Sequence, residues 1–325
     1  MDDKNNAEIL NKLVKDIQDA NPCFKSSNCD EKFLLENYNY ILSSKAKERL
    51  DKLYTYISSG IPVILEGETG CSKTLSAEII CKYIYEKEIL RKNKDKEFLK
   101  FNLSAEVKIN DLMKKFVGDK NSLSGLKIVE GPFYKAFKEG LPLILDEINL
   151  ATEEVLQCIE DTLDSKEINI EISGIGKISQ KMKEGFCLIA TQNPNKDNYM
   201  NKRQNLSQSF LSHFQIIRFP CFDISELKYI AEKLFISFNN DKTGDEKDKQ
   251  FIKDLIKFHS IWTSKEEVKK DITCFTIREI AASVRAYIDE SKKNPFKIIK
   301  VIYGSRYTYK RKKELLELLG GLDSF

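Results

Sequence analysis

The sequence has little that would place the protein in a membrane, outside the cell or on a nucleic acid. No apolar run reaches the roughly 18 residues of a membrane span, and the first residues lack the regions of a signal peptide. No Cys-x-x-Cys pair occurs among the eight cysteines, which predicts reduced thiols rather than disulfides or a zinc site. The net charge of +3 is too small for a global field that attracts polyanions. We expect a cytoplasmic or nuclear protein with no membrane partner, and we do not expect nucleic acid as a partner.

The composition is that of a globular chain. Its 325 residues are 41% hydrophobic and 32% charged, enough for a core larger than that of one usual domain. Strand-like apolar segments alternate with helical patterns up to about residue 221, and only helical patterns follow. We predict an α/β domain with a parallel sheet flanked by helices, then a small all-helical lid domain. The expected ranges are 1–34 for an N-terminal helical or irregular extension, 35–221 for the α/β domain and 222–325 for the helical domain.

The elements of the α/β part can be placed from periodicity and turn residues. Two segments, 118–131 and 168–183, alternate apolar and polar residues about glycines, and we predict that both are β-hairpin insertions. The strands are expected at 61–65, 98–103, 141–145 and 186–190. The helices are expected at 10–17, 50–57, 74–86, 227–238, 251–262, 277–288 and 296–303.

A glycine-containing loop follows the first strand and opens a helix. It consists of Gly67, Glu68, Thr69, Gly70, Cys71, Ser72, Lys73 and Thr74. This pattern predicts a P-loop, in which backbone N–H groups surround phosphates, Lys73 contacts the β and γ oxygens and the Thr74 hydroxyl binds Mg²⁺. An ordinary strand-to-helix turn would need neither Lys73 nor Thr74. We expect nucleotide as the ligand of this loop.

Two side chains of the loop are unusual. Ser72 stands where the pattern has glycine, and because a helix start has a negative φ, we expect serine to fit there with little strain. Cys71 lies beside Lys73 and a helix start, an environment that could lower its pKa and make it sensitive to oxidation. The alternative is that Cys71 is only a small side chain.

Polar residues follow two other predicted strands. Asp146 and Glu147 end an apolar strand, where Asp146 can hold Mg²⁺ and Glu147 can polarise an attacking water. Asn193 follows a later strand, where its amide can contact the γ-phosphate. Because open α/β sheets bind ligands at the carboxyl ends of their strands, we expect these groups to converge near the loop.

These motifs, in this order, resemble the AAA+ superfamily, and within it the clade of midasin, dynein heavy chain and MoxR-type ATPases, most closely a single midasin-type module. The resemblance covers about residues 41–307. Its most specific parts are 146–151 and 190–194. It implies that Lys73 and Thr74 belong to the Walker A motif, Asp146 and Glu147 to Walker B, Asn193 to sensor 1 and Arg278 to sensor 2 on the lid. It further implies ATP and Mg²⁺, hydrolysis to ADP and phosphate, a ring or multi-module AAA+ assembly, and remodelling of a protein substrate that the sequence does not name.

One departure leaves two functions open. Where the family usually has a trans-acting arginine finger, this chain has His213, which is mostly neutral at pH 7. Arginine fingers contribute about three to five decades of rate, so a ring of this chain alone is expected to be a slow ATPase. The alternative is a nucleotide-binding structural subunit with little hydrolysis of its own. A preference for GTP also stays open, because a P-loop reads phosphates and not the base.

Overall fold

The computed structural model describes residues 34, 40–84, 98–118, 126–172, 176–194, 205–240, 243–264, 276–289, 295–305 and 309–320. The helix expected at 10–17 lies outside these ranges. Among the described residues, no helix combines the length and the apolar character needed to cross a bilayer.

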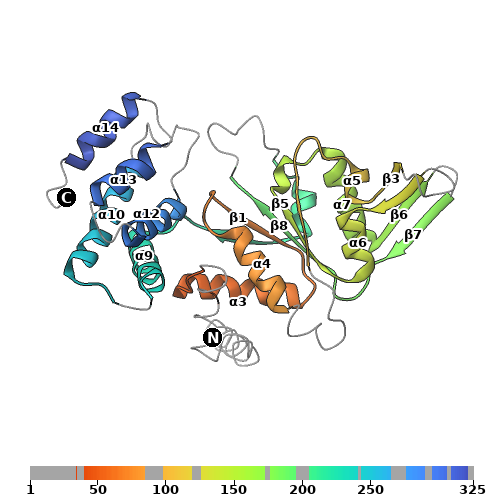
Figure 1. The fold of residues 1–325 in the computed structure, drawn as a ribbon. Coiled ribbons are helices and arrows are strands. Elements are labelled where there is room, and N and C mark those ends of the chain that lie inside the picture. Colours follow the sequence, from red (N-terminus) through yellow and green to blue (C-terminus); the bar gives the residue numbers. More distant parts are fainter. Residues whose placement is uncertain are drawn as a thin grey trace, which may run out of the picture.

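Five parallel strands form the central sheet within the described ranges, in the order β2-β5-β8-β1-β9 (Figure 1). They are β1 (Val63–Gly67), β2 (Leu99–Asn102), β5 (Pro142–Asp146), β8 (Cys187–Gln192) and β9 (Gln215–Phe219). Strands β1, β2, β5 and β8 lie where the sequence predicts strands, and this parallel sheet confirms the α/β class. The sequence does not predict β9. Only Ile217 and Phe219 of β9 are buried, because it is an edge strand with a solvated side.

Both faces of the sheet are covered by helices, as the alternation of side chains requires. Val63 and Leu65 of β1 point to a core shared with α3 (Ser44–Ser58) and α4 (Lys73–Ile84). Ile64 between them points to the opposite core, shared with α6 (Pro132–Glu139), α7 (Glu153–Ser165) and α8 (Gln208–Ser212). Short helices at Ile109–Leu112 (α5) and Ile148–Leu150 (η3) connect these layers.

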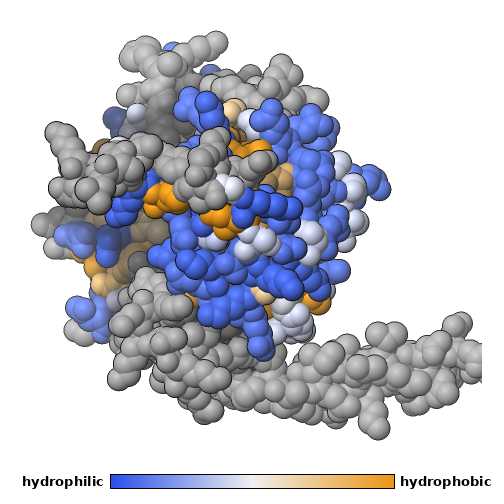
Figure 2. Space-filling model, turned by 90° about the vertical axis from the view of Figure 1, so that its right-hand side faces the viewer, coloured by the Kyte–Doolittle hydropathy of each residue, from blue (hydrophilic) through white to orange (hydrophobic). Residues whose placement is uncertain are grey.

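Two antiparallel hairpins extend from one end of the sheet (Figure 1). The first pairs β3 (Lys114–Gly118) with β4 (Leu126–Glu130), and the second pairs β6 (Glu167–Ile172) with β7 (Gly176–Lys181). The second agrees with the predicted range, whereas the first strand of the first hairpin lies before residue 118, outside the range predicted for it. Figure 2 shows this end of the molecule, whose visible surface is mainly hydrophilic with small separate hydrophobic patches.

The C-terminal helices gather at the opposite end of the sheet (Figure 1). They are α9 (Ile224–Phe238), α10 (Glu246–Ser264), α12 (Ile277–Asp289), α13 (Pro295–Gly304) and α14 (Tyr309–Gly320). Their shared core contains the fully buried Trp262 and Tyr303, and also Ile41, which belongs to the segment before α3. The C-terminal helices therefore pack against a segment that precedes the whole sheet in the sequence.

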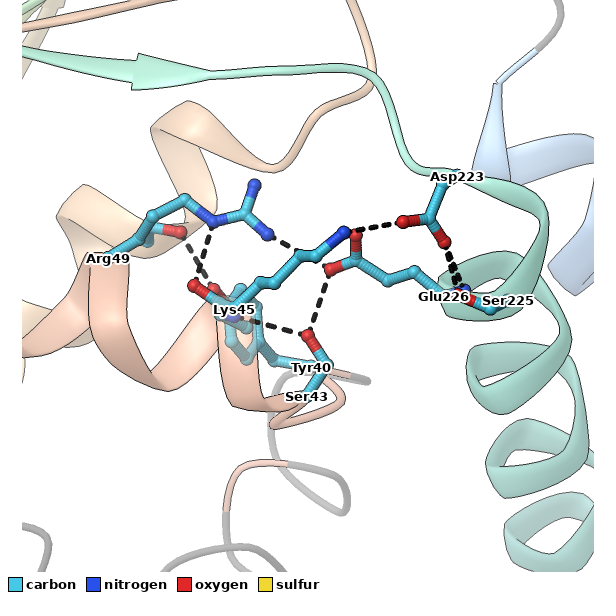
Figure 3. A network of polar contacts seen from close by, with 9 residues as sticks. Tyr40, Ser43, Lys45, Arg49, Asp223, Ser225 and Glu226 are labelled. Carbon is cyan, nitrogen blue, oxygen red and sulfur yellow. Dashed lines mark hydrogen bonds and ion pairs between the residues drawn. The ribbon is translucent and has the colours of Figure 1, made fainter.

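A polar network fastens α9 to α3 (Figure 3). Glu226 of α9 accepts hydrogen bonds from Ser43 Oγ at 2.9 Å and from Arg49 Nη2 at 3.0 Å, and all three residues are buried. Lys45 pairs with Asp223, the residue that caps the N-terminus of α9. Since Ser43 also caps α3, as its sequence position suggests, one small cluster fixes the starts of both helices.

Candidate functional site

The loop between β1 and α4 is built on two glycines that nothing larger can replace. A Cβ on Gly67 would lie 2.2 Å from the carbonyl oxygen of Phe219, because β1 and β9 approach closely there. Gly70 has a φ of +87°, and a Cβ on it would lie 2.5 Å from Cβ of Thr276 at the start of α12. The loop is thus enclosed by β9 on one side and by α12 on the other.

Ser72 corrects the sequence prediction. Its φ is +64°, in the left-handed region, whereas a negative φ and little strain were expected. The reason is that α4 begins one residue later, at Lys73, so Ser72 still belongs to the turn that reverses the chain. A serine in this region costs on the order of 1 kcal/mol relative to glycine, which explains why the general pattern has glycine here.

Lys73 is the buried cation of the loop. Its Nζ donates to the carbonyl oxygens of Gly67 and Glu68, both at 2.8 Å, and to Asn193 Oδ1 at 2.7 Å. Burial lowers the pKa of Lys73 from its ordinary value, while neighbouring acidic groups, including Glu147 and Asp146, oppose that shift. The loop therefore holds an ammonium group where phosphate oxygens would find it.

Asp146 and Thr74 meet across the sheet edge. Thr74 Oγ1 donates to Asp146 Oδ1 at 3.0 Å, and Thr191 Oγ1 donates to the same carboxylate oxygen. Thr191 also accepts from the backbone N–H of Glu147 at 3.1 Å. A hydroxyl and a carboxylate side by side are oxygen donors of the kind that Mg²⁺ prefers, and Mg²⁺ sites at phosphates use only one or two carboxylates. The residues present therefore fit this ion.

Glu147 and Asn193 form the second half of the cluster. Asn193 Nδ2 donates to Glu147 Oε1, and Asn149 Nδ2 donates to the carbonyl oxygen of Asn193 at 2.9 Å. Glu147 has a φ of +58°, so the chain turns sharply where it leaves β5. This turn directs the carboxylate toward β8 instead of along the strand. Lys73, Asn193 and Glu147 thereby form one hydrogen-bonded chain.

A cavity of about 590 Å³ opens over these residues, within the size range of small-molecule sites. Thr69 to Thr74 line it, together with Asp146, Glu147 and Asn193. Its remaining walls come from the segment 40–49 and from the C-terminal helices, and they are largely apolar, with Ile41, Phe222, Ile230, Leu234, Phe238 and Ile277. A site with charged groups at one end and apolar walls at the other suits a nucleotide.

Arg278 reaches this cavity from α12, and so does Arg285. The two residues are seven positions apart, so they lie on one face of the helix, about 10 Å from one another along its axis. Thr276 and Glu279 fix the start of α12, because Glu279 Oε2 accepts from Thr276 N at 2.6 Å and Thr276 Oγ1 accepts from Arg278 N at 3.2 Å. Arg285 also lies over the ring of Phe238, 4.8 Å from its centroid.

Several of these residues were not assigned a role from sequence. Thr191 lies in the polar strand end 190–194, and the position of its hydroxyl there could have suggested a role in the site. Arg285 could have been found from its spacing to Arg278 on the predicted helix. Asn149 lies inside the specific stretch 146–151, but its contact to the backbone oxygen of Asn193 could not be read from the local sequence.

Two further predictions concern Cys71 and His213. Cys71 is buried, and its hydrogen bond with Cys221, followed by burial, raises the pKa of the Cys71 thiol, opposite to the lowering considered from sequence. His213 follows α8, with its ring nitrogens 3.8 Å from Glu160 and 3.6 Å from Asp164 of α7. His213 thus lies beside acidic residues of its own chain. Two other arginines of this region, Arg203 and Arg218, do not stand at the finger position in the sequence: Arg218 is 3.6 Å from Glu66 on its own chain, and Arg203 lies outside the described residues.

The region that contains β1, both acidic residues and Asn193 matches one family model. The model is described as an AAA domain of the dynein-related subfamily, and the match covers residues 62–214. These residues form an AAA domain of that subfamily. The expected resemblance is confirmed, and the chain contains an ATP-binding AAA+ module of the P-loop class.

Curated relatives of the AAA domain agree with this assignment. Midasin of Giardia intestinalis is 28% identical over 202 residues, which are 62% of this chain and 4% of midasin. YojN of Bacillus subtilis (strain 168), an uncharacterized protein, is 28% identical over 165 residues, 50% of this chain and 49% of its own. An uncharacterized protein of Staphylococcus aureus (strain NCTC 8325 / PS 47) is 27% identical over 230 residues, 70% of this chain and 75% of its own. The chain therefore spans a small part of midasin and about half of YojN.

Solved structures share the fold of the AAA domain and its C-terminal helices. A crystal structure of NtrX from Brucella abortus has a TM-score of 0.54 at 14% identity, covering 86% of this chain and 61% of NtrX. A second NtrX structure, in complex with ADP, has a TM-score of 0.50 at 13% identity, covering 95% of this chain and 67% of NtrX.

Proposed function

We propose that the AAA domain binds ATP with Mg²⁺, hydrolyses it to ADP and phosphate, and couples this reaction to the remodelling of a protein assembly. The observation that carries the proposal is the convergence of Lys73, Asp146, Glu147 and Asn193 at the carboxyl ends of β1, β5 and β8. The presence of ADP in one of the similar NtrX structures supports a nucleotide as the ligand.

The proposed roles follow from the contacts. Thr74 and Asp146 would hold Mg²⁺, which on binding would neutralise charge on the β- and γ-phosphates. The backbone N–H groups of 67–74 and the Lys73 ammonium would bind the phosphates. Lys73 would exchange its bonds to the Gly67 and Glu68 carbonyls for bonds to phosphate oxygens, so its ammonium group is already positioned at the site.

Glu147 is the proposed base that orients the attacking water. Its partner Asn193 holds one carboxylate oxygen in place, so the base is positioned by the same side chain that contacts Lys73. Arg278 would bind the γ-phosphate from α12, which belongs to the proposed lid, residues 222–325. Because α12 starts against Gly70, loss of the γ-phosphate would change the contacts between the loop and α12, and the proposed lid could move in response.

A second function is favoured by one observation. His213 occupies the expected finger position and lies beside Glu160 and Asp164. A chain without its own finger fits a nucleotide-binding structural subunit with little hydrolysis, or a subunit that receives an arginine from a different chain. In both cases the partner would be a ring or multi-module AAA+ assembly.

Binding and turnover separate these functions. Lys73→Ala is expected to weaken binding of a fluorescent ATP analogue at least tenfold, with the exposed Lys135 of α6 changed to Ala as the matched control. Glu147→Gln is expected to retain binding but to lower steady-state hydrolysis about 100-fold, the usual contribution of a general base. Glu154→Gln, an exposed glutamate of α7, is its control. If the wild type binds ATP yet hydrolyses it no faster than Glu147→Gln at every protein concentration, hydrolysis by this chain alone is excluded, and the chain is a structural subunit or needs an arginine from a different chain.

A further inference from the structure

Two cysteines from distant parts of the sequence meet beside the phosphate-binding loop. Cys71 lies in that loop and is 4% exposed, whereas Cys221 lies in the connector between β9 and α9 and is exposed. Their side chains are in hydrogen-bond contact, and neither is in a disulfide.

The contact follows from the sheet and not from a chance side-chain conformation. β1 and β9 are paired in parallel with Gly67 opposite Phe219, and the Phe219 carbonyl lies against Gly67. The chain leaves these two strands at the same edge, into the phosphate-binding loop on one side and into the connector on the other. Cys71 and Cys221 are therefore held near one another by the backbone.

The two thiols differ in their access to solvent. Cys221 is exposed and can meet a small oxidant in solvent. Cys71 is buried, and its hydrogen bond with Cys221, followed by burial, raises the pKa of its thiol, so oxidation is expected to begin at Cys221. This is the division between an attacking and a resolving cysteine.

We propose that Cys71 and Cys221 form a reversible disulfide in the presence of peroxide, and that this disulfide closes the nucleotide site. In the first step the Cys221 thiolate attacks one peroxide oxygen and the O–O bond breaks, which forms a sulfenic acid on Cys221. The departing hydroxide takes up the proton that the Cys221 thiol released and becomes water. In the second step the sulfur of Cys71 attacks the sulfur of Cys221, the S–S bond forms, the S–O bond breaks, and the hydroxyl leaves with the Cys71 proton as water. Two thiols are oxidised and one hydrogen peroxide is reduced to two waters.

The disulfide affects nucleotide binding because of where its two ends lie. A disulfide brings its sulfurs to about 2.05 Å, shorter than a hydrogen-bonded contact, so the loop and the connector must draw together. The loop between Gly67 and Lys73 would then be unable to adjust around phosphates. The connector precedes Asp223, the cap of α9, so the C-terminal helices would be tied to the loop as well. By linkage, bound nucleotide is expected to slow formation of the disulfide.

The first measurement is direct detection of the bond, which does not depend on nucleotide binding. The full chain is treated with hydrogen peroxide, digested without reduction and analysed by mass spectrometry. We expect a peptide pair linked through Cys71 and Cys221, which dithiothreitol separates. Cys221→Ser is expected to lack it, whereas Cys158→Ser, a change at a partly buried cysteine of α7, is expected to retain it. Oxidation only to sulfinic acid, or pairing with other cysteines, would overturn the proposal.

The second measurement concerns the site, and this half of the inference rests on the proposed nucleotide binding. Affinity for a fluorescent ATP analogue is expected to fall at least tenfold on oxidation of the wild type, to recover on reduction, and to be insensitive to peroxide in Cys221→Ser. If the disulfide forms and affinity is unchanged, the closing role is wrong. If the reduced wild type binds no nucleotide, the proposed function fails, while the mapped disulfide still decides whether the redox pair exists. Circular dichroism of Cys221→Ser confirms that the variant folds.

Discussion

At the residue scale, the site contains two non-glycine residues in the left-handed region, Ser72 with a φ of +64° and Glu147 with a φ of +58°. Each bounds a sharp turn at the carboxyl end of a strand. Such conformations cost about 1–3 kcal/mol and persist only where surrounding contacts enforce them. Gly70 packed against Thr276 supplies that enforcement for the first turn, and the hydrogen bond from Asn193 does so for the second.

Substitutions at Ser72 test this strain. Ser72→Gly is expected to leave nucleotide binding intact and to change the free energy of unfolding by less than about 1 kcal/mol, because relief of strain is offset by the greater entropy of the unfolded chain. Ser72→Val is expected to destabilise the protein by about 1–2 kcal/mol, since a β-branched residue tolerates a positive φ poorly. Urea unfolding measures both. Equal stabilities of the Val and Gly variants would contradict a left-handed Ser72.

The sequence identifies the reactive groups of the site better than their conformations. Lys73, Asp146, Glu147 and Asn193 could be proposed because each follows a strand, and parallel strands bring their carboxyl ends together. The φ of Ser72 could not be predicted, since it depends on whether α4 begins at residue 72 or 73, and the local sequence does not decide that. The pKa of Cys71 was misjudged for a related reason, because Cys221, which raises it, lies in a distant segment.

At the element scale, the contact between α3 and α9 connects the sheet to the C-terminal helices. Its centre is the buried pair of Arg49 and Glu226, whose side chains are 10% and 6% exposed. Arg49 also lies over the ring of Phe219, 5.3 Å from its centroid, so the same side chain contacts β9. Residues separated this far in sequence carry no local pattern, which is why neither this pair nor the edge strand β9 could be predicted.

Removing one member of the pair leaves the other charge buried. Glu226→Ala is therefore expected to lower the free energy of unfolding by about 3–5 kcal/mol, whereas replacing both Arg49 and Glu226 by Met and Leu is expected to cost less. Lys52→Ala, which breaks a surface pair with Glu48, serves as the control and is expected to stay within about 0.5 kcal/mol. Denaturant unfolding measures all three. A loss in Glu226→Ala no larger than in the control would show that the contact is dispensable.

The core of the C-terminal helices makes stability dependent on pH. Burial lowers the pKa of His259 from 6.5 to about 4, and its Nδ1 is 2.8 Å from the hydroxyl of Tyr303. The unfolded chain therefore binds a proton more readily than the folded one, so stability is complete above pH 6.5 and is lost as the pH falls toward 4. The full effect is on the order of 3 kcal/mol. In His259→Leu the decline in unfolding free energy between pH 7 and 4.5 is expected to be shallower, and an unchanged slope would exclude this histidine as its cause.

At the scale of the whole molecule, the absence of an arginine at position 213 bears on whether one copy of the chain can complete the nucleotide site of another. The proposed nucleotide site has cations from its own chain, Lys73, Arg278 and Arg285, but the position expected to face a neighbour holds His213. A homo-oligomer would then bind ATP at each site without the charge that speeds its cleavage. The rate of ATP hydrolysis would therefore depend on which chains form the proposed assembly.

His213→Arg tests this position. The variant is expected to raise ATP turnover per chain at least tenfold, and only at concentrations where sedimentation shows self-association. Gln215→Arg, which adds the same charge at an exposed residue two positions away, is expected to leave turnover unchanged. An assembled His213→Arg protein that hydrolyses ATP no faster than the control would show that this residue does not face a neighbouring nucleotide.

Ile41 lies in the hydrophobic core of the C-terminal helices although it precedes the whole sheet in sequence, and Tyr40 beside it bonds to Ser76 of α4 at 3.0 Å. A protein cut between β9 and α9 would retain each phosphate-facing group of the sheet and yet expose Ile41 and lose most of the apolar wall of its cavity. If the C-terminal helices were joined to the sheet of a relative, their core would lack Ile41. An exchange of the C-terminal helices of this chain therefore has to include residues 40–49.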